Sequence, residues 1–316
     1  MRASVRNRWN RYWFEPAPPI GLAICRVLFF GAFLVYYLRI SYTELADVPP
    51  HSWHAIWPFV LVGIRLPSAL TLNVLQWLWW ASLLGACVGA AYRWTSLAAF
   101  ALGLYLIGLT EQIARINHSD AIVVFGLGIM AVSRAADTFS VDALLGLISS
   151  NRLNESGEYT WPIRAMWVVI VTIYFAAGVT KLVTSGLVWI TSDNLSNLLM
   201  LAPIAQSPLT LVGQELGRYR ALSTTLAALT LIVELAAPLA LVSRRARWIV
   251  VPALYGMQVG IRLLMGPGFT EFFVCGLFWI PWGRLDTHLR FSSPRVRTVD
   301  RAVQTYGISG ASSGRR

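Results

Sequence analysis

Apolar stretches of membrane-spanning length follow one another along most of the chain, and they restrict its fold more strongly than any motif. A helix that crosses the hydrocarbon core needs about 20 apolar residues. Hydrophobic residues make up 56% of the sequence and charged residues 13%, a balance unlike that of soluble domains. We therefore predict an all-α, polytopic bundle of about eight transmembrane helices. The predicted spans are residues 20–40, 69–91, 96–113, 121–132, 165–183, 222–242, 248–265 and 269–282.

The positions of the basic residues predict the orientation of these spans. If the N-terminus is cytoplasmic, the inner segments contain 18 of the 26 basic residues, as the positive-inside rule requires. Both termini of this multi-pass cell-membrane protein are then cytoplasmic. The net charge of +11 fits contacts with the lipid bilayer, and no nucleic-acid partner is predicted.

Three segments are predicted from this topology. Residues 1–19 form a cytoplasmic segment of basic and aromatic residues at the membrane interface. Residues 20–284 form the transmembrane domain, and residues 285–316 form a disordered cytoplasmic tail rich in Arg, Ser and Gly. The outer segment 184–221 contains an apolar stretch that could cover an outward-facing cavity.

Lys181 is the only lysine in a chain with 26 basic residues, and it lies near the outer end of the fifth predicted span. Arginine stays charged in proteins, whereas lysine can lose its proton. A neutral amine beside an aromatic cavity can act as a base. The alternative is a lysine whose stem lies in lipid and whose ammonium reaches the interface.

A second polar element lies at the outer end of the fourth predicted span, in the sequence Ile116-Asn-His-Ser-Asp120. Its depth is similar to that of Lys181, so we predict one site on the extracytoplasmic side. His118 could share a proton or orient a substrate oxygen. It could also cap a helix start together with Asn117.

Other charged residues leave alternatives open. Arg26 and Glu234 lie within predicted spans and are either a buried pair or separate polar anchors. His51 and His54 have helical spacing without a nearby acidic or thiol partner, so no metal site is predicted.

Four sequence segments resemble one known family in order and spacing. They are Ala23-Ile-Cys-Arg-Val-Leu-Phe-Phe-Gly31, then Asn117-His-Ser followed by Thr138-Phe-Ser-Val-Asp-Ala-Leu144, and Tyr174-Phe-Ala-Ala-Gly-Val-Thr-Lys-Leu182. Together they resemble the HTTM family, the transmembrane domain shared by vitamin K-dependent gamma-glutamyl carboxylase and many small bacterial membrane proteins. The last segment is similar to the one that carries the active-site lysine of the carboxylase.

The resemblance implies a carboxylase-like or epoxidase-like enzyme of the oxidoreductase or lyase class. Lys181 would be the base that deprotonates a reduced quinone of the vitamin K or menaquinone type, and His118 would be a second catalytic residue. O2 would be a co-substrate, and so would CO2 if the reaction is a carboxylation. The quinol-binding residues implied are Asn117, Tyr174 and Gln258.

The sequence also departs from the family pattern. Thr180 stands where the carboxylase has a second lysine, and Gln258 stands where members often carry histidine. The chain ends soon after the eighth predicted span, so the resemblance implies a small member without the large extracytoplasmic portion that binds the protein substrate. The alternative function is a non-enzymatic membrane partner of an extracytoplasmic peptide or protein, in peptide or toxin maturation or export.

Overall fold

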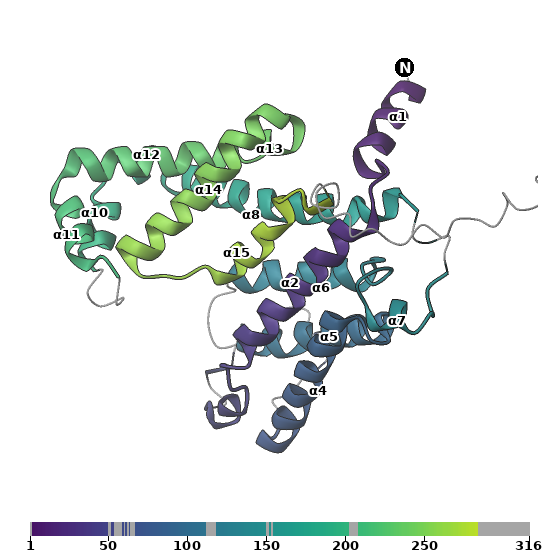
Figure 1. Ribbon diagram of the computed structural model, residues 1–316. Helices are drawn as coiled ribbons and strands as arrows, with labels where there is room; N and C mark the ends of the chain where they lie inside the picture. Colours follow the sequence, from purple (N-terminus) through teal and green to yellow (C-terminus); the bar gives the residue numbers. More distant parts are fainter. Residues whose placement is uncertain are drawn as a thin grey trace, which may run out of the picture.

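The computed structural model contains only helices, turns and one isolated β-bridge among its described residues (Figure 1). The structure describes residues 2–49, 52–53, 59, 61, 63, 67–111, 118–149, 152, 154–201 and 208–283. The predicted tail 285–316, Asn117, His51 and His54 lie outside these residues. The all-α class predicted from the apolar stretches is confirmed.

The N-terminal half of the chain forms one group of packed helices. In it, α4 packs against α2 and α5, and α5 packs against α6. The elements are α1 (Arg2–Trp13), α2 (Pro19–Tyr37), η1 (Thr43–Asp47), α4 (Ala69–Val88), α5 (Tyr92–Thr110), α6 (His118–Ala131) and α7 (Val141–Leu144).

Helix α8 joins this group to the C-terminal half, because it packs against α6 on one side and α12 on the other. In Figure 1, α12 and α14 lie to the left of α2, and α10 and α11 lie at their far end. The elements are η4 (Gly157–Tyr159), α8 (Trp161–Ser185), α9 (Val188–Thr191), α10 (Asn194–Met200), α11 (Thr210–Arg218), α12 (Arg220–Ala236), α13 (Leu239–Val242), α14 (Arg244–Met265), α15 (Thr270–Gly276) and η5 (Leu277–Trp279).

Local sequence signals explain several helix ends. Ser68 and Ser243 accept hydrogen bonds from the first turns of α4 and α14, as N-cap residues do. Proline occupies the first turn of α2 and of α8, where its missing N–H costs nothing. Helix α4 ends at Gly89 in the left-handed conformation, with φ of 69°, which glycine adopts without strain.

The membrane character predicted from composition is supported by helix length. Within the described residues, five helical segments are long and apolar enough to span a bilayer, and there are six if α11 and α12, bent by 104° at their junction, form one span. The fourth and eighth predicted spans correspond to shorter apolar helices, Ser119–Ala131 and Thr270–Trp279. The sixth corresponds to α12 and α13. The count of eight and the cytoplasmic termini stay predictions.

Candidate functional site

The ammonium of Lys181 forms an ion pair between α8 and α12. Lys181 Nζ donates to Glu234 Oε1, and the side chains are 24% and 6% exposed, respectively. The ring of Trp189, on α9, lies 4.9 Å from Nζ, within the range of a cation–π contact. The only lysine of the chain therefore has a carboxylate and an aromatic ring as neighbours.

A glycine allows this close approach of the two helices. A Cβ atom at Gly178 would lie 3.0 Å from Glu234 Cβ, which is tighter than ordinary packing. Gly178 precedes Lys181 by three residues and therefore lies on the same face of α8. The absence of a side chain at Gly178 brings α12 near enough for Glu234 to reach the lysine.

A second polar contact lies on the same face of α8, about two turns before Lys181. Gln258 Nε2, from α14, donates to the hydroxyl oxygen of Tyr174 at 3.0 Å. Both side chains are buried, and the Tyr174 ring packs against Phe272 at 5.2 Å between centroids. Two of the three residues predicted to bind a quinol are thus in direct contact.

Each of these two contacts leaves one buried oxygen free. Glu234 Oε2 and Gln258 Oε1 have no hydrogen-bond partner within the described part of the chain. Buried polar atoms in native proteins are almost always paired, and an unpaired acceptor costs about 1–3 kcal/mol. Each of these two oxygens is free to accept a hydrogen bond from a water molecule or a ligand.

The other two predicted site residues lie at or beyond the start of α6. Asn117 is outside the described residues, and the side chain of His118 is not described, although His118 is the first residue of α6. Tyr159, just before α8, donates to Asp137, just after α6, at 2.9 Å. Helices α6 and α8 are therefore antiparallel.

The register between α6 and α8 gives the level of His118 along the bundle. A Cβ atom at Gly126 would lie 3.5 Å from Met166 Cε, so these residues are at one level. His118 precedes Gly126 by eight residues and Tyr174 follows Met166 by eight, which is about 12 Å in each case. The backbone of His118 therefore lies near the level of Tyr174 along the helix axes. A contact between His118 and Lys181 stays a prediction.

The sequence indicates a buried charge at Glu234, but the pairing of Glu234 with Lys181 is seen only in the structure. The alternative of an Arg26–Glu234 pair is wrong, since each residue has another partner. Arg26, fully buried, donates from Nη2 to the carbonyl oxygen of Phe139. The usable signal was that Lys181 and Glu234 are lone charges in consecutive apolar stretches.

The motif at residues 138–144 lies at the start of α5, away from the Lys181–Glu234 pair, and has a structural role there. Asp142 accepts hydrogen bonds from Ala91 N at 2.8 Å and Tyr92 N at 2.9 Å. It therefore caps α5 from a distant segment of the chain.

We expect Asp142→Ala to lower the free energy of unfolding by about 1–2 kcal/mol, because two amides at the start of α5 lose their acceptor. Denaturant unfolding in detergent measures this. Asp193→Ala is the control, since its pair with Arg220 at 3.5 Å is exposed and contributes about 0.5 kcal/mol or less. Equal stability of the Asp142 variant and the wild type would contradict the capping role.

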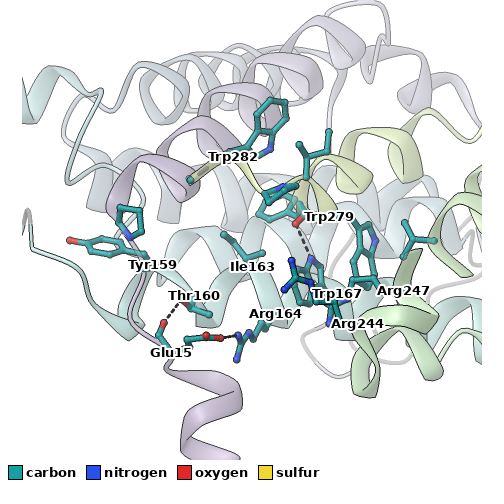
Figure 2. Close-up of a pocket in the computed structure, with 18 of the residues that line it drawn as sticks. Glu15, Tyr159, Thr160, Ile163, Arg164, Trp167, Arg244, Arg247, Trp279 and Trp282 are labelled. Carbon is teal, nitrogen blue, oxygen red and sulfur yellow. Dashed lines mark hydrogen bonds and ion pairs between the residues drawn. The ribbon is translucent and has the colours of Figure 1, made fainter. Parts of the chain in front are cut away.

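A cavity of about 710 Å³ lies at the opposite end of α8 from Lys181. Arg164, Trp167 and Trp279 are among its lining residues (Figure 2). Arg164 precedes Lys181 by 17 residues on α8, which corresponds to about 25 Å along the helix axis. Of the predicted site residues whose side chains the structure describes, none lines this cavity.

Comparison with known proteins gave one match. A family model described as "HTTM domain" matches residues 14–277. No curated protein and no solved structure matches the chain.

Proposed function

The chain belongs to the HTTM family, and from this membership we propose that it oxidises a reduced quinone, with Lys181 as the base, at a site between α8, α12 and α14. The observation that carries the proposal is the pair of buried acceptors without partners, Glu234 Oε2 and Gln258 Oε1. A hydroquinone has two hydroxyl donors, so its chemistry fits these two oxygens.

The Lys181–Glu234 pair supplies the basic group. A base role requires a neutral amine at Lys181, and Glu234, which accepts a hydrogen bond from Nζ, is the group placed to take the lysine proton. The amine of Lys181 then takes a proton from a bound hydroxyl group. The pair gains one proton in total, which it releases through the exposed edge of Lys181.

Tyr174 and Gln258 orient the bound molecule. The hydrogen bond from Gln258 Nε2 to Tyr174 fixes the orientation of the Gln258 amide. Oε1 therefore accepts a hydrogen bond from one defined direction. His118 and Asn117 would contribute from α6 and the segment before it. A reduced quinone of the vitamin K or menaquinone type would supply the hydroxyl donors, and its oxidation to the quinone would release two electrons and two protons. O2 would take up both electrons and both protons as H2O2, and CO2 would be consumed only in a carboxylase-type reaction. The site faces the extracytoplasmic side.

We expect Lys181→Arg and Lys181→Ala to lower quinol turnover by about 100-fold or more, the usual effect of removing a general base. Arginine keeps the charge and removes the titratable amine. The assay follows quinone formation by purified protein supplied with reduced menaquinone or vitamin K and O2. Thr180→Ala, the exposed neighbouring position, is the matched control and should retain wild-type turnover.

Equal turnover in wild type, Lys181→Arg and Lys181→Ala would remove Lys181 from catalysis. Absence of turnover in the wild type with both quinols would favour the alternative, a non-enzymatic membrane partner that helps mature or export an extracytoplasmic peptide. That function predicts co-purification with such a peptide, independent of Lys181.

A further inference from the structure

The 710 Å³ cavity at the start of α8 has a positively charged wall. Three arginines and one carboxylate line it, so two positive charges remain uncompensated within the cavity. The carboxylate, Glu15, pairs with Arg164. No carboxylate of the described residues pairs with Arg244 or Arg247.

Arg247 is held in place by aromatic rings and one backbone bond. Its Cζ atom lies 4.1 Å from the ring centroid of Trp167 and 5.7 Å from that of Trp279. The two tryptophan rings stack at 4.8 Å, and Arg247 Nε donates to Ala240 O at 2.9 Å. The terminal nitrogens of a guanidinium fixed in this way are available as donors to an anion.

A nearby phenol does not offset this charge. The Tyr12 ring lies 4.9 Å from Arg164 Cζ. Burial raises the pKa of the Tyr12 phenol, against the opposing effect of Arg164, so the phenol stays neutral. Helices α2, α8 and α14 all begin beside the cavity, and their dipoles add to the positive potential.

Most of the other residues that line the cavity are apolar, with Tyr159 and Thr160 as polar exceptions. Ile163, Val251, Pro252, Trp248 and Trp282 line it, and Trp248 is 68% exposed on the outer surface of α14. The volume of the cavity is typical of sites that enclose an organic ligand. An arginine-rich wall beside apolar walls at the end of spanning helices matches a molecule with an anionic head and an apolar body.

We propose that this cavity binds an anionic phospholipid, with Arg244 and Arg247 on the headgroup phosphate and the tryptophan and proline side chains against the glycerol and the first acyl carbons. Arg164 lines the cavity, but its charge is already neutralised by Glu15, so it is not assigned to the phosphate. The site is separate from the Lys181 site and does not depend on the proposed function.

The test is the binding of phosphatidylglycerol and phosphatidylcholine, with identical acyl chains, to the delipidated full-length protein in detergent, followed by native mass spectrometry. The wild type should bind phosphatidylglycerol about tenfold more tightly, because the choline cation opposes the arginines. Arg244→Gln/Arg247→Gln should weaken phosphatidylglycerol binding about 30-fold, or about 2 kcal/mol, at about 1 kcal/mol per arginine.

The matched control removes two arginines outside the cavity. Arg93→Gln/Arg245→Gln changes exposed residues that do not line it, and phosphatidylglycerol binding should stay within about twofold of wild type, the effect of distant screened charges. If loss of Arg247 prevents folding, Arg244→Gln alone should weaken binding about fivefold. Equal weakening in both double variants, or equal affinity for the two lipids, would overturn the proposal.

Competition with inorganic phosphate distinguishes the two sources of the anion. Inorganic phosphate in molar excess over the lipid should not displace phosphatidylglycerol if the acyl chains contribute to binding. Displacement by phosphate alone would show a site for a free anion and would overturn the lipid assignment.

Discussion

Gly89→Ala is expected to prevent accumulation of the folded protein. A Cβ atom at Gly89 would lie 1.9 Å from Arg26 Nη1 and 2.4 Å from Ser140 Cβ, so the side chains around it must move. The φ angle of 69° adds about 1–2 kcal/mol for any residue with a Cβ. Displacing the buried Arg26 from the Phe139 carbonyl adds about 1.5–3 kcal/mol, the usual contribution of a hydrogen bond to a charged group, and the sum is a large part of the usual stability of a protein.

The matched control is Gly256→Ala in α14, where a Cβ would meet nothing within 4 Å. This substitution should be neutral or stabilising by up to about 1 kcal/mol, because alanine favours the helix. Yield of monodisperse protein in detergent and its thermal unfolding measure both effects. Normal yield and stability of Gly89→Ala would show that the contact between Arg26 and the end of α4 does not hold these segments together.

Removing either member of the Lys181–Glu234 pair should destabilise the protein, and removing both should restore it. Lys181→Met leaves the 6% exposed Glu234 without its partner, and we expect a loss of about 3 kcal/mol. Glu234→Leu should cost less, because the 24% exposed lysine can extend to the interface. Lys181→Met/Glu234→Leu should recover most of the stability, since apolar replacement of a buried pair is often neutral.

The double variant separates structure from catalysis, because it should unfold like the wild type and lack quinol turnover. Unfolding of the four proteins gives a coupling energy, expected at about 1–3 kcal/mol for contacting residues. The exposed pair of Arg218 and Glu215, 63% and 56% exposed, is the reference and should couple by about 0.5 kcal/mol. Similar coupling for both pairs would contradict a buried Lys181–Glu234 interaction.

Sequence periodicity and length predicted the helical membrane class, but they did not predict where helices break. The predicted span 222–242 was continuous, whereas the structure ends α12 at Ala236 and starts α13 after Pro238. Apolar content does not report such breaks, because both sides of the break are equally hydrophobic. The match to the HTTM model over residues 14–277 confirms the family predicted from four short segments.

Alignment of the predicted span ends explains why the partner of Lys181 was missed. Placing the outer ends of the fifth and sixth spans level puts Glu234 deeper than the lysine. In the structure, Arg220 at the start of α12 bonds to Thr191 O at 3.2 Å, so α12 begins beyond the end of α8. This offset brings Glu234 level with Gly178, and it depends on the packing of α9 and α10, which a hydropathy pattern does not contain.

The length of α8 makes bilayer thickness a variable of the candidate site. Lys181 follows Trp161, the first residue of α8, by 20 residues, or about 30 Å, which equals the thickness of a typical hydrocarbon core. An upright α8 therefore places the ammonium at the hydrocarbon boundary, and a tilted α8 draws it below that boundary. Bilayer thickness therefore decides whether water or lipid surrounds the Lys181–Glu234 pair when α8 crosses the membrane.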